Sequence, residues 1–228
     1  MNNYPWMALY PPGVDWHAKL EPMSVGAMFG AAVERFGANP CLDFLDKRYT
    51  YAEVAQLAAQ AAKGLQQIGV TKGSRVGLFL PNTPYYVITY LAVLQIGGVV
   101  VNFNPLYAEQ EVAKQIKDSG CKLMVTLDLQ VLYDKLAKMF DQAGLERIIV
   151  CRMADILPPL KALLFPLSRY KELAAVPHDA RHVPFHQLIA NDGKPQPVAI
   201  EPMTDVAVLQ YTGGTTGVPK GAVLTHAG

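Results

Sequence analysis

The chain has 228 residues, of which 51% are hydrophobic and 17% are charged; this composition indicates a globular protein with a buried core and excludes a disordered chain. The formal net charge is +1, so the chain lacks the basic excess that is typical of nucleic-acid-binding proteins. No uninterrupted apolar run reaches the roughly 18 residues that a membrane span needs.

Cysteine usage and the first residues indicate a compartment. Cys41, Cys121 and Cys151 lie far apart, show no C-x-x-C metal spacing, and their odd number argues against a disulfide framework. The N-terminal sequence MNNYPWMALYPPG lacks the basic region and apolar core of a signal peptide. We therefore expect a cytoplasmic protein.

The first predicted elements are a helix, a hairpin and a second helix. Ser24 is placed to cap a helix that runs to about residue 36 and stops at Gly37. The segments CLDFL and RYTY then predict a β-hairpin. Thr50 and Glu53 have the spacing of a capping box, which predicts a long helix ending at Gly69.

Apolar strands and helices then alternate. Thr83 is expected to cap a helix that has Pro84 at its first position. Because the strands are apolar throughout and are separated by helices, they predict right-handed crossovers and an α/β fold, with a mostly parallel sheet covered by helices on both faces. The predicted strands span residues 75–81, 99–103, 121–127 and 146–151.

Residues 152–202 break this alternation. They are rich in proline, only PFHQLIAN has a helical pattern, and we predict a long connector. Its stretch ILPPLKALLFPLSRY is apolar, carries Lys161 and Arg169, and is interrupted by prolines. A surface connector packed on its own domain is the favoured interpretation, and a segment that lies on a membrane surface is the alternative.

A Gly/Thr-rich loop follows the next predicted strand, residues 205–211. It has the sequence YTGGTTGVPKG, and AVLTH after it predicts another strand, so the loop should join two strands at the start of a second sheet. Glycines let successive N–H groups turn toward one anion, threonines add hydroxyl donors, and the lysine adds a positive charge. The predicted phosphate-binding residues are Thr212, Gly213, Gly214, Thr215, Thr216, Gly217 and Lys220.

Other interpretations of the loop are weaker. A Walker A loop needs Ser or Thr after its lysine and would start a helix there, whereas Pro219 precedes Lys220 and Gly221 follows it. This disfavours a P-loop kinase or NTPase. A flexible hairpin and a non-catalytic α/β assembly module stay as alternatives. A metal site is not expected at His178, His182 and His186, because Pro184 interrupts any shared helix and no carboxylate has ligand spacing.

The loop resembles the signature loop of the adenylate-forming enzymes, which include acyl-CoA synthetases, adenylation domains and luciferases. That loop is commonly Y-T-S-G-T-T-G-x-P-K-G, and this chain has glycine where many members have serine. TYAEV and LQIGGVVVNFNPLY match two further family motifs in the expected order, so the resemblance covers about residues 24–228. The ending NFNPLY of the second motif and the N-terminal stretch YPPGVDW favour the long-chain fatty acid–CoA ligases within the family.

The resemblance implies a function. The loop would bind the β- and γ-phosphates of ATP while a carboxylic acid, for which the resemblance favours a fatty acid, attacks the α-phosphate and releases pyrophosphate. The acyl group of the acyl-AMP would then pass to coenzyme A, releasing AMP. ATP, Mg²⁺ and coenzyme A are the implied cofactors. Small molecules are the expected partners, without nucleic acid; peripheral membrane contact and a homodimer stay open, as does adenylation of an aryl or amino acid.

The family's downstream motifs have no counterpart in these 228 residues. No catalytic residue and no metal ligand is therefore assigned, and we expect an N-terminal portion that is inactive alone. The predicted division is a lead-in at 1–23, an α/β subdomain at 24–151, the connector at 152–202, and the strand–loop–strand unit at 203–228, which would start a further subdomain.

Overall fold

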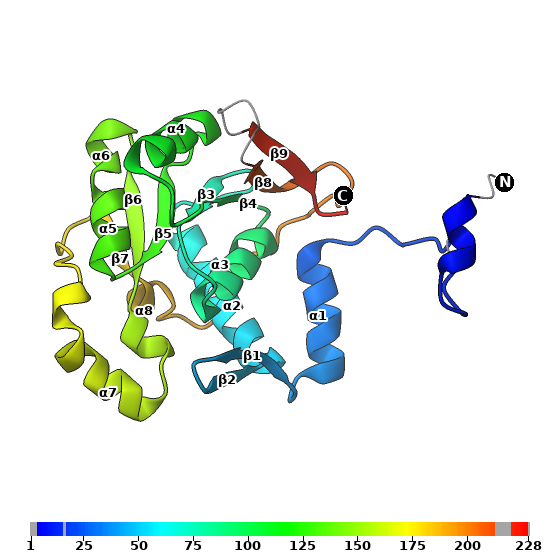
Figure 1. The fold of residues 1–228 in the computed structure, drawn as a ribbon, viewed down its shortest axis with the longest axis horizontal. Helices are drawn as coiled ribbons and strands as arrows, with labels where there is room; N and C mark the ends of the chain where they lie inside the picture. Colours follow the sequence, from blue (N-terminus) through cyan, green and yellow to red (C-terminus); the bar gives the residue numbers. More distant parts are fainter. Residues whose placement is uncertain (1–3, 16, 213–219, 228) are drawn as a thin grey trace.

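A seven-stranded sheet lies at the centre of the computed structural model, which describes residues 4–15, 17–212 and 220–227 (Figure 1). All its neighbouring strands are parallel except for the antiparallel pair β8–β9, so the predicted α/β architecture is confirmed. In spatial order the strands are β7 (His182–Pro184), β6 (Arg147–Cys151), β5 (Leu123–Leu127), β3 (Arg75–Leu78), β4 (Val99–Asn102), β8 (Val206–Thr212) and β9 (Lys220–Thr225).

Helices cover both faces of the sheet. The chain passes from β3 to β4 through α3 (Pro84–Gln95) and returns across β3 to β5 through α4 (Glu109–Ser119). Because both crossovers are right-handed, the reversal of direction places α3 and α4 on opposite faces. Helix α2 (Tyr51–Gln67) packs on α3, and α8 (Phe185–Leu188) packs on α2. Helix α5 (Gln130–Ala137) packs on β5 and on α6 (Met139–Gln142), and an ion pair between Lys138 and Glu109 links their junction to α4.

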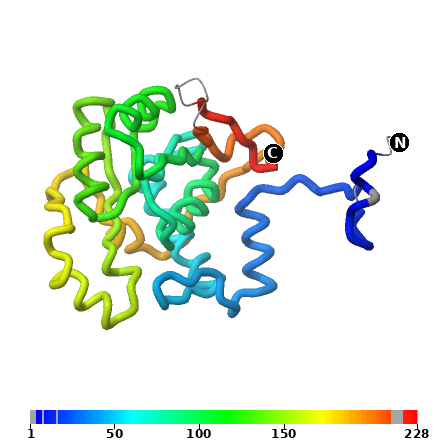
Figure 2. Tube along the Cα trace, viewed as in Figure 1, coloured from blue at the N-terminus to red at the C-terminus, as the bar shows by residue number. Residues whose placement is uncertain are grey.

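The N-terminal elements lie outside these layers. Helix α1 (Val25–Phe36) packs on α2 and α3, and the hairpin of β1 (Pro40–Phe44) and β2 (Lys47–Thr50) packs on α2. The short helix η1 (Pro5–Leu9) projects away from the body, as the chain trace in Figure 2 shows. Among the described residues, none of the helices has both the length and the apolar content that crossing a membrane requires.

Local hydrogen bonds explain where the first helices begin. The Ser24 hydroxyl accepts a bond from the Ala27 N–H at 3.1 Å. Thr50 N–H donates to Glu53 Oε2 at 2.7 Å and Glu53 N–H donates to Thr50 Oγ1 at 3.2 Å, so the predicted capping box is confirmed. Helix α3 begins at Pro84 as expected, but the Thr83 side chain makes no capping bond.

The core lies where α2, α3 and α4 meet the sheet. Its central strands are apolar on both sides, and side chains such as Val76, Val100 and Met124 are fully buried. Burying each such side chain contributes about 1.5 to 3 kcal/mol before the entropy of ordering is subtracted. The strands are therefore continuously apolar in sequence because both faces of the parallel sheet are buried.

The connector prediction for residues 152–202 was too simple. The segment forms η2 (Met153–Ile156), α7 (Pro159–Ser168), η3 (Tyr170–Glu172), the edge strand β7 and α8. Helix α7 was not predicted because prolines usually interrupt helices. Pro158 and Pro159 are tolerated here because they stand at the start of the helix, where a missing N–H breaks no helical hydrogen bond. The predicted local helix in PFHQLIAN is confirmed as α8.

The expected second sheet is also corrected. Strand β8 pairs with β4 in parallel, with Val100 opposite Val208 and Asn102 opposite Gln210, and β9 pairs with β8. The two strands therefore extend the main sheet, because the exposed hydrogen-bonding edge of β4 is available to the next apolar strand. The four-part domain division stays a prediction.

Candidate functional site

The Gly/Thr-rich loop connects β8 to β9 across an antiparallel hairpin. Of the predicted phosphate-binding residues, Thr212 ends β8 and Lys220 begins β9, directly opposite each other and both exposed. Cross-strand partners project from the same face, so one hydroxyl and one ammonium stand together at the mouth of the hairpin. The other five predicted residues lie outside the described residues: Gly213, Gly214, Thr215, Thr216 and Gly217.

The hairpin stands at the carboxyl ends of parallel strands. Because β8 runs parallel to β4 and β3, Thr212 lies at the edge where open α/β sheets bind their ligands. Lys220 begins a strand and not a helix, so the prediction that the loop joins two strands is confirmed and the P-loop NTPase alternative is wrong. With about 4 Å between the Lys220 ammonium and a phosphate oxygen, the Coulomb attraction would be roughly 4 kcal/mol before the cost of desolvation is subtracted.

On the α4 side, Tyr211 fixes the base of the hairpin. Its hydroxyl donates to Asp118 Oδ2 of α4, and its side chain is buried. Burial, followed by the hydrogen bond and charge of Asp118, raises the pKa of Tyr211 well above its usual range, so the hydroxyl stays protonated and donates. Gly221 lies opposite Tyr211, and a Cβ there would be 3.1 Å from Tyr211 Cζ, so the aromatic ring occupies the space that glycine leaves.

On the α3 side, a polar ladder holds the same strand. Asn102 Nδ2 donates to Gln210 Oε1 at 2.7 Å, and the Tyr86 hydroxyl of α3 donates to Asn102 Oδ1 at 3.0 Å. Burial raises the pKa of Tyr86, which keeps this donor neutral. Gln115 of α4 donates to the Asn102 backbone carbonyl at 2.7 Å. Strand β8 is therefore fixed from both faces where it leaves the sheet, so the hairpin starts from a rigid base.

The sequence predicted the loop but not the side-chain contacts that hold strand β8 at its base. Asn102 lies within the NFNPLY motif, and the alternation of β8 could have placed Gln210 and Tyr211 on opposite faces. Asp118 offered no signal, because it is an exposed carboxylate of a helix 93 residues away from Tyr211. Its role depends on the order of the strands, which the sequence did not reveal.

Of the three histidines at 178, 182 and 186, His182 has a structural role in the described chain. His182 lies in β7, where Nε2 bonds the Tyr133 hydroxyl at 2.8 Å and Nδ1 bonds Asp179 Oδ1 at 2.7 Å. Both ring nitrogens are thus occupied by protein partners. Within residues 4–15, 17–212 and 220–227, no three His, Cys, Asp or Glu side chains lie together where they could hold a metal ion.

The described fold is a mostly parallel α/β sheet whose Gly/Thr-rich loop lies at the carboxyl ends of its parallel strands. The family model described as "AMP-binding enzyme" matches residues 29–228, and the chain belongs to this family. It is 35% identical over 225 residues to a long-chain-fatty-acid–CoA ligase of Bacillus subtilis (strain 168), an alignment that covers 97% of this chain and 40% of that protein. The chain thus spans about 40% of the length of this curated relative.

Two further comparisons agree with this assignment. The chain is 30% identical over 198 residues to 4-coumarate–CoA ligase 1 of Petroselinum crispum, covering 86% of this chain and 31% of that one. The crystal structure of a long-chain-fatty-acid–CoA ligase from Archaeoglobus fulgidus superposes with a TM-score of 0.70 at 25% identity, covering 92% of this chain and 38% of that one. These proteins share the fold and are acid–CoA ligases by name.

Proposed function

We propose that this chain supplies the ATP-phosphate-binding part of an AMP-forming acid–CoA ligase. The observation that carries the proposal is the hairpin YTGGTTGVPKG at the carboxyl edge of the sheet, held by Tyr211–Asp118 on one face and by the Gln210–Asn102–Tyr86 ladder on the other. The similarity to named acid–CoA ligases over most of the chain supports it.

In the proposed reaction, a carboxylate attacks the α-phosphate of ATP, the acyl-AMP forms, and pyrophosphate leaves. Negative charge on the leaving phosphates needs fixed donors and a cation. We assign that task to the hairpin hydroxyls and backbone N–H groups of residues 212–217 and to the Lys220 ammonium. Coenzyme A then displaces AMP from the acyl group. Mg²⁺ would neutralise phosphate charge when bound, and we assign it no ligand in this chain.

A long-chain fatty acid is the proposed acid. The similarity to the Bacillus subtilis ligase is higher and covers more of the chain than the similarity to 4-coumarate–CoA ligase, which favours the aliphatic substrate. An aryl acid is the second candidate, since that relative also matches most of the chain. Palmitate and 4-coumarate should be compared at equal concentration; higher kcat/KM with 4-coumarate would replace the fatty acid in the proposal.

Pyrophosphate release from ATP and palmitate, measured on the complete protein that carries this chain, tests the reaction. Lys220→Ala should lower kcat/KM by about 100-fold, because one preorganised cation is lost from the leaving-group site. Lys114→Ala, which removes an exposed lysine of α4, is the matched control and should leave the rate unchanged. An unchanged kcat/KM in Lys220→Ala would contradict the role of the hairpin in the mechanism. If the complete protein shows no ATP-dependent activity with any acid, the non-catalytic assembly module would be favoured.

The remaining proposals concern this chain and its surroundings. Because the downstream family motifs have no counterpart here, we propose that the 228-residue chain alone does not form acyl-CoA; acyl-CoA production by the purified chain would overturn this. We further propose a cytoplasmic protein with peripheral membrane contact. A homodimer of the complete protein is the further partner to test, and light scattering measures its mass.

A further inference from the structure

Helix α7 exposes its apolar face. Four of its leucines have the spacing i, i+3, i+4, i+7 that a globular protein normally turns toward its core. Here they point outward, with exposed fractions of 69% for Leu160, 71% for Leu163, 50% for Leu164 and 74% for Leu167. Such a stripe on a described surface needs a partner, because contiguous exposed apolar area is unfavourable in water.

The opposite face of α7 makes the contact with the protein. Ala162, Phe165 and Pro166 are partly buried, and they stand on the helix face away from the leucines. Helix α7 packs against η2 and lies at the periphery of the molecule, at the end of the sheet far from β8 and β9 (Figure 1). The leucine stripe therefore faces away from both the body and the Gly/Thr-rich hairpin.

A neighbouring turn extends the stripe. Lys161 Nζ donates to the Leu45 carbonyl at 3.2 Å and pairs with Asp46 Oδ2 at 2.6 Å, which holds the β1–β2 turn against α7. Leu45 is itself 52% exposed, and Tyr170, just after α7, is 64% exposed. Leu45 beside α7 and Tyr170 after its end therefore add exposed apolar side chains near the helix, and tyrosine is a residue favoured at membrane interfaces.

The charges around the stripe have one prevailing sign. From residue 159 to residue 172 the chain contains three cations, Lys161, Arg169 and Lys171, and one carboxylate, Glu172. Lys161 pairs with Asp46 and Arg169 pairs with Glu172, so Lys171 contributes the excess positive charge of this segment. The base of α7 borders a pocket of about 460 Å³. Its ionisable lining residues are three cations and two carboxylates: Lys47, Arg48, Arg152, Asp46 and Asp155. Cations thus outnumber carboxylates both in the segment and in the pocket lining, and exposed leucines beside a net positive charge fit the interface of a bilayer that contains anionic lipid.

We propose that helix α7 is a peripheral membrane-docking element, which inserts Leu160, Leu163, Leu164 and Leu167 into the interfacial region of an anionic bilayer while its basic neighbours contact the lipid phosphates. The inference rests on the peripheral membrane contact proposed above and names the element that makes it, but it is independent of the proposed enzymatic function, because it uses no residue of the hairpin. The binding test accordingly contains no ATP, acid or coenzyme A.

The test is co-sedimentation of the full chain with two kinds of vesicle, phosphatidylcholine alone and phosphatidylcholine mixed with phosphatidylglycerol. The wild type should bind the mixed vesicles more tightly, and added salt should weaken that binding. Leu163→Glu combined with Leu167→Glu should weaken binding by at least about tenfold, because two inserted side chains become charged. Lys171→Glu should weaken binding to the mixed vesicles by about fivefold and leave binding to phosphatidylcholine unchanged.

The matched control introduces the same two charges at exposed apolar positions outside α7. Leu20→Glu combined with Val131→Glu changes residues with exposed fractions of 89% and 72%, and it should bind vesicles like the wild type. Far-UV circular dichroism should be the same for all variants, since each changed side chain is exposed.

Three outcomes would overturn the proposal. The wild type could fail to bind the mixed vesicles at low salt, or the α7 variant and the control variant could lose binding equally. Light scattering could also reveal a dimer of the wild type that Leu163→Glu with Leu167→Glu converts to a monomer without any change in lipid binding. That third outcome would assign the stripe to a second copy of the chain.

Discussion

The Tyr211 hydroxyl joins the hairpin to α4 through its hydrogen bond to Asp118. Tyr211→Phe should lower the free energy of unfolding by about 1 kcal/mol, because a hydrogen bond to a carboxylate is lost while the exposed Asp118 regains water. Urea denaturation measures this loss. Tyr170→Phe is the control, since that ring is 64% exposed, and it should leave the denaturation midpoint unchanged. Equal midpoints for wild type and Tyr211→Phe would show that the contact contributes nothing to stability.

Gly221 makes room for the same ring. An added Cβ would approach Tyr211 Cζ to 3.1 Å and Cε2 to 3.2 Å, so the ring would have to move away from Asp118. Gly221→Ala should therefore cost about 1 to 3 kcal/mol of stability. A double-mutant cycle with Tyr211→Val checks the cause: the penalty of Gly221→Ala should largely disappear once the ring is absent. A penalty that is the same in both backgrounds would place the strain elsewhere.

At the scale of elements, the contact between α2 and α8 depends on one glycine. A Cβ on Gly64 would clash with the Leu188 backbone carbonyl oxygen and would lie 2.8 Å from Leu188 Cγ. Gly64→Ala should destabilise the protein by about 2 to 3 kcal/mol, because overpacking outweighs the roughly 1 kcal/mol of helix propensity that alanine adds.

The control for this prediction is Gly30→Ala in α1. A Cβ at Gly30 would meet no atom within 4 Å, so only the propensity gain remains and stability should rise by up to about 1 kcal/mol. Thermal unfolding followed by circular dichroism distinguishes the two variants. A stabilising effect of Gly64→Ala would mean that α8 can move away from α2 without loss.

The elements differ in how far their sequences determined them. Short-range signals sufficed for the helix starts at Ser24 and Thr50, because a cap and its partner lie within one turn. Helix α7 was missed because its leucine pattern is interrupted by Pro166 and adjoins two other prolines. The loop's composition indicated phosphate binding, but its rigid base could not be predicted, since Asp118 and Asn102 meet β8 only through the strand order.

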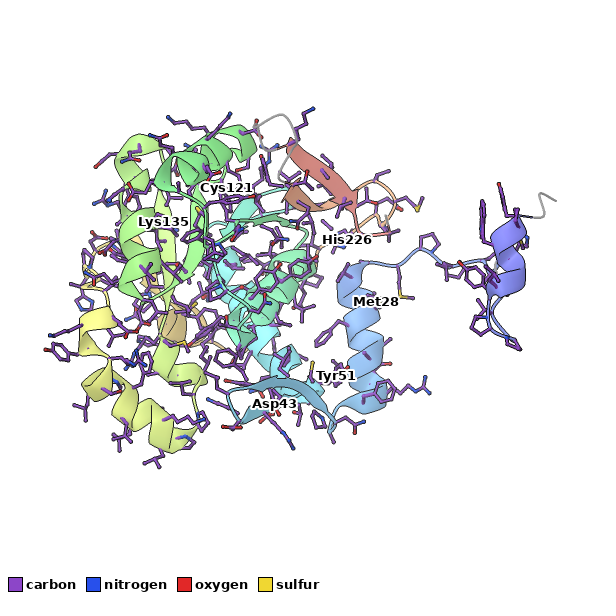
Figure 3. All side chains as sticks on the ribbon, in the orientation of Figure 1. Met28, Asp43, Tyr51, Cys121, Lys135 and His226 are labelled. Atoms are coloured by element: carbon purple, nitrogen blue, oxygen red, sulfur yellow. The ribbon has the colours of Figure 1, made fainter. Side chains whose placement is uncertain are left out.

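For the whole molecule, one buried histidine connects the C-terminal strand β9 to the first α-helix, α1. His226, labelled in Figure 3, follows β9. Its Nδ1 accepts a hydrogen bond from the Val25 N–H of α1 at 3.3 Å. This contact requires a neutral ring. Its Nε2 atom is buried and has no hydrogen-bond partner among the described residues, so a second proton on the ring would bring an unsolvated charge into this junction.

The pH dependence of stability follows from this geometry. Burial, opposed by the Asp205 carboxylate and reinforced by Lys72, lowers the pKa of His226 in the folded chain. The unfolded chain therefore takes up the proton first as the pH falls, so the stabilisation is complete above about pH 6.5 and declines as the pH drops toward the folded pKa.

His226→Asn keeps an acceptor for the Val25 N–H but does not titrate, so its unfolding free energy should fall less steeply than that of the wild type between about pH 7 and pH 5. Urea denaturation across this range measures the slope, and hydrogen exchange at the Val25 amide locates the loss at α1. His178→Asn removes an exposed histidine and should keep the wild-type slope. If the slope of His226→Asn equals that of the wild type, another titrating group governs the acid response, and the junction between β9 and α1 does not depend on the charge of His226.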